Sequence, residues 1–337
     1  MILSGSGRKE REEIYRKDEI LDMDMIKNRM KKMKPRNFLL IGFIALLWII
    51  LTVLSPHFIK ISNLLLLLQQ SSIVMVAGIG MTFVILTGGI DLSIGSVAAL
   101  SSVTLGIAIT KWEWGVLPAL LAGMLTGAVF GMFNGVLISY FKLQPMVCTL
   151  GVMSIARGLT YIFTSGRSMF VTDRLLIRIG NGRIGGIPII VLIAVVLFGI
   201  GYMILNYTYF GRSIYALGGN EEATRLSGID TRKVKTLTYA FCGFCAGVVG
   251  ILYVCTLGAS EPTVGQGLEL NATAVTAIGG TSLLGGIGSL VGTVFGAVLI
   301  GTINNGLSIL NIVSYYQQLL LGVVIILAVL LERFKKK

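Results

Sequence analysis

The chain has 337 residues, of which 54% are hydrophobic and only 13% are charged. With 43 glycines and a mean hydropathy of +0.84, it lies far outside the range of soluble domains. The net charge of +12 comes from basic residues beside apolar runs, so it indicates membrane topology and not nucleic-acid binding. The composition predicts an all-α, polytopic membrane protein.

Residues 1–37 are polar and end in a basic block, Lys27 to Arg36, directly before the first apolar run. A signal peptide would place its basic residues nearer the start, so we predict a cytoplasmic N-terminal segment instead. Disorder before Met25 and a start codon at Met25 are both compatible with this pattern. We assign residues 38–334 to one transmembrane domain.

Counting about 20 apolar residues for each crossing, the sequence predicts ten membrane spans. They lie near 38–55, 64–86, 92–110, 115–140, 146–164, 187–207, 236–257, 269–284, 287–310 and 314–332. With both termini in the cytoplasm, most basic loops and the tail 333–337 also lie inside, as the positive-inside rule expects. The exception is the arginine-rich loop 165–186, which is long enough to hold a helix of its own.

The connection between the second and third spans reads G-G-I-D-L-S-I-G at 88–95. The glycine pair ends one helix, and Asp91 can cap the next. Asp91 would then have a structural role only, whereas an acid buried in the membrane would indicate function. Both readings stay open, and Asp91 and Ser93 are candidates for the translocation pathway. A weak similarity of this region to 279–299 hints at an internal repeat.

In the fourth span, glycine recurs every four residues, at Gly123, Gly127, Gly131 and Gly135. This spacing predicts a strip without side chains on which another helix packs closely. We therefore expect the fourth span to lie in the interior of the bundle. A path for substrate along the strip is the alternative.

Arg157 lies within the fifth span, where an arginine must find a polar partner or reach the interface. A structural hydrogen-bonding role and a place near the pathway are equally compatible with this position. Asparagine amides in spans either bond to other helices or meet the hydroxyls of a solute. The further candidates for the pathway are Asn134, Asn271, Asn304 and Asn305.

The longest polar interruption runs from Tyr209 to Lys235, within a predicted cytoplasmic loop at 208–235. Asn220 is a good N-cap, acidic residues follow in the first turn, and Gly228 ends the pattern, which predicts a short helix. A connection between spans needs only a few residues, so the size of this loop indicates a cytoplasmic partner.

The eighth span, 269–284, is short, begins with polar residues and ends in a glycine-rich run, so it predicts a broken or re-entrant helix. The glycines that follow, at 285, 286, 288 and 292, approach a dinucleotide fingerprint, but Val291 stands where the last glycine is required. We interpret them as glycines for membrane-helix packing.

The chain contains no GxxxxGK[ST] phosphate loop, so it lacks a Walker-type ATP site. Its cysteines lie in or beside apolar runs without a histidine nearby and are expected to pack in helices; they are Cys148, Cys242, Cys245 and Cys255. We predict no cofactor, no metal site and no catalytic residue.

Three strings resemble one family: G-R-S-I-Y-A-L-G-G-N-E-E-A-T-R-L-S-G-I at 211–229, G-G-I-D-L-S-I-G at 88–95, and T-L-G-V-M-S-I-A-R-G-L at 149–159. They look like the permease subunits of bacterial sugar importers of the ribose type, within the ATP-binding-cassette superfamily. In that family the short helix of the cytoplasmic loop sits in a groove of the ATPase. The resemblance implies an ATPase-coupling surface made of Gly219, Asn220, Glu221, Glu222, Ala223, Arg225, Leu226 and Gly228.

The resemblance also implies the function of the chain and its partners. The chain would be a transport subunit in the bacterial inner membrane, surrounded by lipid, that imports a monosaccharide such as ribose or another pentose by alternating access. Its partners would be an ATPase usually with two cassettes in one chain, an extracytoplasmic sugar-binding protein, and a second permease subunit in a homodimer or heterodimer.

Other functions are alternatives to sugar import. Permeases of the same superfamily for nucleosides, a furanosyl signalling molecule or amino acids share the general plan. An ion-coupled secondary transporter is less favoured, because Asp91 and Arg157 are nearly the only ionisable residues within the spans. A membrane enzyme would need a catalytic constellation, which the sequence does not offer.

Overall fold

In a computed structural model of the chain, the structure describes residue 38, residues 40–313, and positions 315, 316, 318, 319, 322, 323 and 326. The predicted N-terminal segment 1–37 lies outside these residues, as does much of the tenth predicted span. The assignments of the N-terminal segment and of one domain over 38–334 therefore stay predictions.

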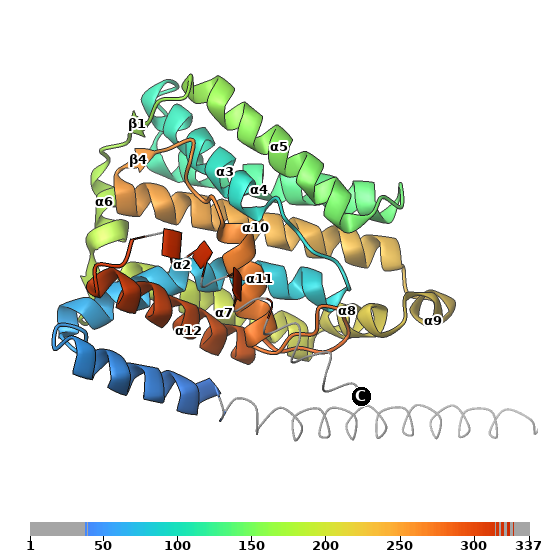
Figure 1. The fold of residues 1–337 in the computed structure, drawn as a ribbon. Coiled ribbons are helices and arrows are strands. Elements are labelled where there is room, and N and C mark those ends of the chain that lie inside the picture. The colour runs from blue at the N-terminus through green and yellow to red at the C-terminus, as the bar shows by residue number, and fades with distance from the viewer. Residues whose placement is uncertain are drawn as a thin grey trace, which may run out of the picture.

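Helices make up most of the described chain (Figure 1). They are the helix Leu40–Leu54, α2 (Ile61–Leu86), α3 (Ile94–Thr110), α4 (Val116–Ser139), α5 (Pro145–Thr164), α6 (Arg174–Asn181), α7 (Ile189–Tyr207), α8 (Tyr209–Gly219), α9 (Glu221–Leu226), α10 (Thr231–Leu257), α11 (Leu268–Ile278) and α12 (Leu290–Ile309). Two-residue strands form two antiparallel pairs, β1 (Met169–Phe170) with β4 (Ala259–Ser260) and β2 (Arg183–Ile184) with β3 (Ile187–Pro188).

The helices match the predicted spans closely. Among the described residues, α2, α4, α5, α7, α10 and α12 are long and apolar enough to cross a membrane. The helix Leu40–Leu54, α3 and α11 are apolar but shorter. Each of the first nine predicted spans thus coincides with a helix, and the prediction of an all-α polytopic protein is confirmed.

The core is built around α2 and α10. The second half of α2, from Ser71 to Leu86, is almost wholly buried, and so is most of α10 beyond Thr238. Helices that are apolar on all sides are expected at the centre of a bundle. The helices α3, α4, α7, α11 and α12 pack around these two, while α5 lies at the edge against α3 and α4 (Figure 1).

The glycine strip of α4 packs directly on the backbone of α10. A Cβ atom on Gly127 would overlap the carbonyl oxygen of Gly243 and lie 2.7 Å from the Gly247 nitrogen. A Cβ atom on Gly135 would lie 2.6 Å from Cα of Thr236. The predicted close packing is confirmed, and it uses glycines on both helices.

The predicted position of α4 in the bundle interior is wrong. Only the glycine face of α4 is buried in this chain, and its opposite face exposes a row of large apolar side chains. These are Leu117, Leu121, Leu125 and Val129. A glycine strip requires one close neighbour and does not determine what covers the other face of the helix.

The loop 165–186 contains a helix of its own, as predicted. Asp173 caps α6 by accepting a hydrogen bond from the Leu175 nitrogen (2.7 Å). Gly180, near its end, touches the carbonyl of Cys255 at the end of α10. Figure 1 shows α6, β1 and β4 at one end of the bundle, and α8 and α9 at the other.

The eighth span is broken, as predicted: α11 ends at Ile278, where the glycine-rich run begins, and a second non-helical segment precedes the helix. After α10, residues 259–267 run beside α3 without helical structure. Ser260 Oγ donates to the Ser102 carbonyl (2.7 Å), and Gly95 lies so close to the Gly265 carbonyl that a Cβ atom would overlap it. The 11 residues of α11 span about 16 Å, half of a bilayer core. In Figure 1, α11 crosses its neighbours α2 and α12 at a steep angle.

The contact between α4 and α10 leads to a first prediction. We expect Gly127→Ala to destabilise the purified protein by about 1–3 kcal/mol, since the methyl group must push two backbones apart. Gly199→Ala in α7 is the control, because a Cβ atom there meets nothing within 4 Å. Thermal unfolding in detergent measures the difference, and equal melting temperatures for the two variants would contradict the close contact.

Candidate functional site between α7 and α10

The connection between α7 and α10 contains two helices where the sequence predicted one. The missed helix is α8, whose buried side carries Gly211, Ile214 and Leu217. Thr208 caps it through Oγ1, which accepts from the Gly211 nitrogen (3.2 Å). The N-cap and the apolar residues three positions apart were readable signals, but the charged and polar residues between them made the segment look like a surface loop.

The predicted helix is α9, and its local chemistry is as expected. The Asn220 Oδ1 atom accepts from the Ala223 nitrogen (3.0 Å), and two acidic residues occupy the first turn. The helix ends before Gly228, whose φ of +85° suits glycine. Within α9 only Thr224 is buried, where its hydroxyl donates to the Asn220 carbonyl (2.8 Å).

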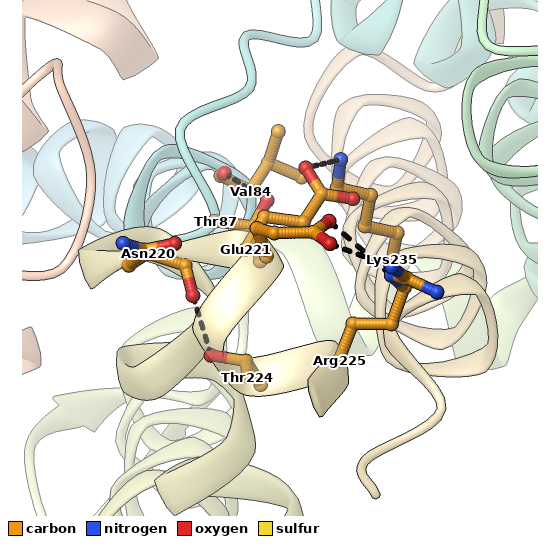
Figure 2. A network of polar contacts seen from close by, with 8 residues as sticks. Val84, Thr87, Asn220, Glu221, Thr224, Arg225 and Lys235 are labelled. Carbon is orange, nitrogen blue, oxygen red and sulfur yellow. Dashed lines mark hydrogen bonds and ion pairs between the residues drawn. The ribbon is translucent and has the colours of Figure 1, made fainter. Parts of the chain in front are cut away.

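Ion pairs fix the orientation of α9 and its charges. Lys235, in α10, lies 2.6 Å from Glu221 and connects the two helices (Figure 2). Within α9, Arg225 lies 2.6 Å from Glu222. The hydrogen bond and positive charge of Arg225 lower the pKa of Glu222, and Glu222 raises the pKa of Arg225. Both side chains are therefore charged at neutral pH.

Next to these charges, α9 presents an apolar side chain to the outside. Leu226 is 75% exposed. All eight residues of the predicted coupling surface are exposed and lie on or directly beside α9. The surface thus combines one apolar side chain with charges of both signs, which are the contacts that a protein partner can use.

The predicted pathway residues do not form one site. Asp91, Ser93 and Asn134 form a buried cluster next to the start of α3. Asp91 Oδ1 accepts from the Ser93 nitrogen (2.9 Å) and hydroxyl (2.6 Å), and the Asn134 amide donates to the Ser93 hydroxyl (2.8 Å). Asp91 is only 1% exposed and stands two residues before the N-cap position of α3. Its structural role is visible here, and a role in transport stays a prediction.

The other candidates lie elsewhere in the fold. Arg157 Nη1 donates to the carbonyls of Pro262 (2.6 Å) and Val264 (3.0 Å), which shows its structural hydrogen-bonding role. The amide of Asn305 forms a reciprocal pair with Asn63 of α2 (2.9 and 3.0 Å) and so connects two helices.

The last two asparagines also stand apart from the buried cluster. Asn271 lies in α11 and donates to the Gly267 carbonyl (3.2 Å) within its own helix. Asn304 lies half-buried in α12. Sequence reasoning could not pair Asn305 with Asn63, since 242 positions separate them.

Comparison with protein families identifies the family of the chain. The family model described as "Branched-chain amino acid transport system / permease component" matches residues 63–329. The chain belongs to this permease family. It is thus a transport subunit, the permease component of an ATP-binding-cassette transporter, and not an enzyme. No solved structure matches the chain significantly.

Several curated relatives of this permease are named for sugars. The ribose import permease protein RbsC of Escherichia coli strain K12 is 43% identical over 301 residues, covering 88% of this chain and 93% of the relative. RbsC of Bacillus subtilis strain 168 is 42% identical over 86% of this chain and 90% of its own length. The D-allose transport system permease protein AlsC of Escherichia coli strain K12 is 36% identical over 93% of this chain and 98% of the relative.

The bonds of Arg157 lead to a prediction about the broken span. Replacement by methionine, Arg157→Met, keeps the apolar stem but removes both bonds to the 259–267 segment. Hydrogen bonds from charged groups contribute about 1.5–3 kcal/mol, so we expect amide exchange in this segment to become at least about tenfold faster. Hydrogen-exchange mass spectrometry measures this, with Lys111→Met at an exposed position as the control. Unchanged exchange in Arg157→Met would contradict the structural role.

Proposed function

We propose that this permease imports a monosaccharide, with ribose or another pentose as the favoured substrate. The observation that carries the proposal is the 43% identity to a ribose import permease over 88% of this chain. The relative named for D-allose makes a hexose the second candidate. An amino acid is less favoured in spite of the family description, because the sugar permeases match over nearly their full length.

The ATPase partner of the permease would dock on the coupling surface defined by Gly219 to Gly228. Support comes from the exposure of α9, from Leu226 at its outer side, and from the charges of Glu222 and Arg225. The chain lacks a phosphate loop, so ATP hydrolysis requires a partner chain, expected to carry two cassettes. This end of the bundle would face the cytoplasm of a bacterial cell, together with both termini.

The opposite end, with α6 and the β1–β4 pair, would then face the extracytoplasmic sugar-binding protein. The exposed apolar faces of α4 and α5 would be covered by lipid or by a second permease subunit. In this mechanism, ATP binding closes the cassettes, α9 moves with them, and the helix bundle opens outward to receive the sugar. Hydrolysis of ATP returns the bundle to its initial state.

A co-purification experiment tests the docking surface. We expect the wild-type chain to retain its ATPase in detergent, and Leu226→Ser to reduce the recovered ATPase about tenfold or more, as for a central apolar contact. The triple replacement of Glu221, Glu222 and Arg225 by alanine should have a similar effect. Lys111→Ala, exposed in the loop after α3, is the matched control and should retain the ATPase.

Two results would contradict the proposal in different ways. If Leu226→Ser and the triple variant retain as much ATPase as the wild type, α9 is not the docking surface. If the wild type retains no ATPase, and vesicles containing it accumulate ribose on an ion gradient alone, the protein is a secondary transporter.

A further inference from the structure

At the end of α8, close to α9 in the chain, three backbone segments from distant parts of the sequence touch one another. They are the end of α2 at Leu86, the end of α8 at Gly218, and the loop between α11 and α12 at Gly285 and Gly286. A Cβ atom on Gly218 would overlap both the Leu86 carbonyl oxygen and the Gly286 nitrogen. We call this contact the glycine junction.

The contacts at the junction are reciprocal. A Cβ atom on Gly285 would lie 2.8 Å from the Gly88 nitrogen and 3.0 Å from the Gly218 carbonyl oxygen. One on Gly286 would lie 2.9 Å from the Gly219 nitrogen. Gly285 and Gly286 also have φ values of +88° and +71°, which residues other than glycine rarely adopt. The junction therefore leaves no room for a Cβ atom at these three positions unless the backbones move apart.

Hydrogen bonds hold the three segments together. The Gly286 nitrogen donates to the Leu86 carbonyl (2.9 Å), which joins the α11–α12 loop to the end of α2. The Tyr215 hydroxyl, in α8, donates to the Gly288 carbonyl (3.1 Å), which joins α8 to the same loop. No flexible side chain separates the backbones, so a displacement of one segment must move the others or break these contacts.

The segments joined here are those that connect α9 to the interior. Only Asn220 separates α8 from α9, so a force on α9 acts directly on Gly218. Leu86 precedes the connection to α3, and Gly286 lies in the connection that follows the half-length helix α11. The junction thus links the exposed helix α9 to the α2–α3 connection and to the α11–α12 loop.

At its other end α9 is joined to α10 by residues 227–230 and by the ion pair between Glu221 and Lys235. The ion pair is a weaker link than the glycine junction. The Glu221 side chain is 51% exposed, and pairs of this kind are screened by salt and contribute little. It also connects α9 to the start of α10 and not to the interrupted helices. A close backbone contact is stiffer than two long side chains that meet in water.

We propose that the glycine junction transmits the movement of α9 to α2 and to the α11–α12 loop, so that Gly218, Gly285 and Gly286 position the coupling machinery without touching the ATPase or the sugar. This inference rests on the proposed function, since it assumes that an ATPase moves α9. The proposal gives Gly285 and Gly286 a role in coupling, through their contact with Gly218 at the end of α8.

The test compares Gly218→Ala with the wild type, each reconstituted with the co-expressed ATPase and a sugar-binding protein. We expect Gly218→Ala to retain the ATPase and its basal ATP hydrolysis within about twofold. We expect the ribose transported per ATP hydrolysed to fall about tenfold, as for a methyl group forced into a closed contact. Gly199→Ala, with open space around it, is the matched control and should transport like the wild type.

A second variant covers the case in which Gly218→Ala does not fold. Tyr215→Phe adds no volume and removes the hydroxyl that donates to Gly288. We expect it to retain the ATPase and to lower the transport-to-hydrolysis ratio about threefold, as for the loss of one hydrogen bond.

The possible outcomes separate the two proposals. A normal transport-to-hydrolysis ratio in every junction variant that folds would overturn the junction and leave the importer in place. Loss of the ATPase itself from Gly218→Ala or Tyr215→Phe would also overturn it, because the residues would then belong to the docking surface. If the wild type binds no ATPase, the proposed function fails first.

Discussion

Direct contact between backbones is the constraint on which this fold depends. Along α4 and α10, glycines on both helices let the two backbones approach so closely that a Cβ atom would collide. At the glycine junction the same kind of contact joins α2, α8 and the α11–α12 loop. Without a strong hydrophobic force between helices in lipid, such packing is a main source of cohesion. It also makes the inner parts of the bundle stiff.

The non-helical part of the eighth span is tolerated because its polar backbone groups find hydrogen-bond partners inside the protein. Arg157 donates to two carbonyls of the 259–267 segment, and Ser260 bonds to the Ser102 carbonyl of α3. Irregular backbone at membrane depth is tolerated only in such surroundings. The buried cluster of Asp91, Ser93 and Asn134 has the same character where α2 passes into α3. Both interruptions are thus held by specific hydrogen bonds.

The candidate site differs from this interior in every respect. The helix α9 is short, almost wholly exposed and charged, with Leu226 on its outer side. It is attached to the bundle through α8, through residues 227–230 that lead into α10, and through the Lys235 ion pair. An exposed surface of this kind directly above a rigid glycine junction is a suitable arrangement for receiving movement from a partner and passing it inward. Membership in a permease family agrees with that arrangement.

The sequence by itself determined the all-α membrane fold, the helices at the first nine predicted spans, the capping of α9 and the close packing of the α4 glycines, because these depend on hydropathy and local spacing. Tertiary structure alone decided what required distant partners. It paired Asn305 with Asn63, directed Arg157 to the 259–267 segment, and left the outer face of α4 exposed. It also placed the side of α8 that carries Ile214 and Leu217 against the bundle, which the local signals of a cap and apolar spacing did not show.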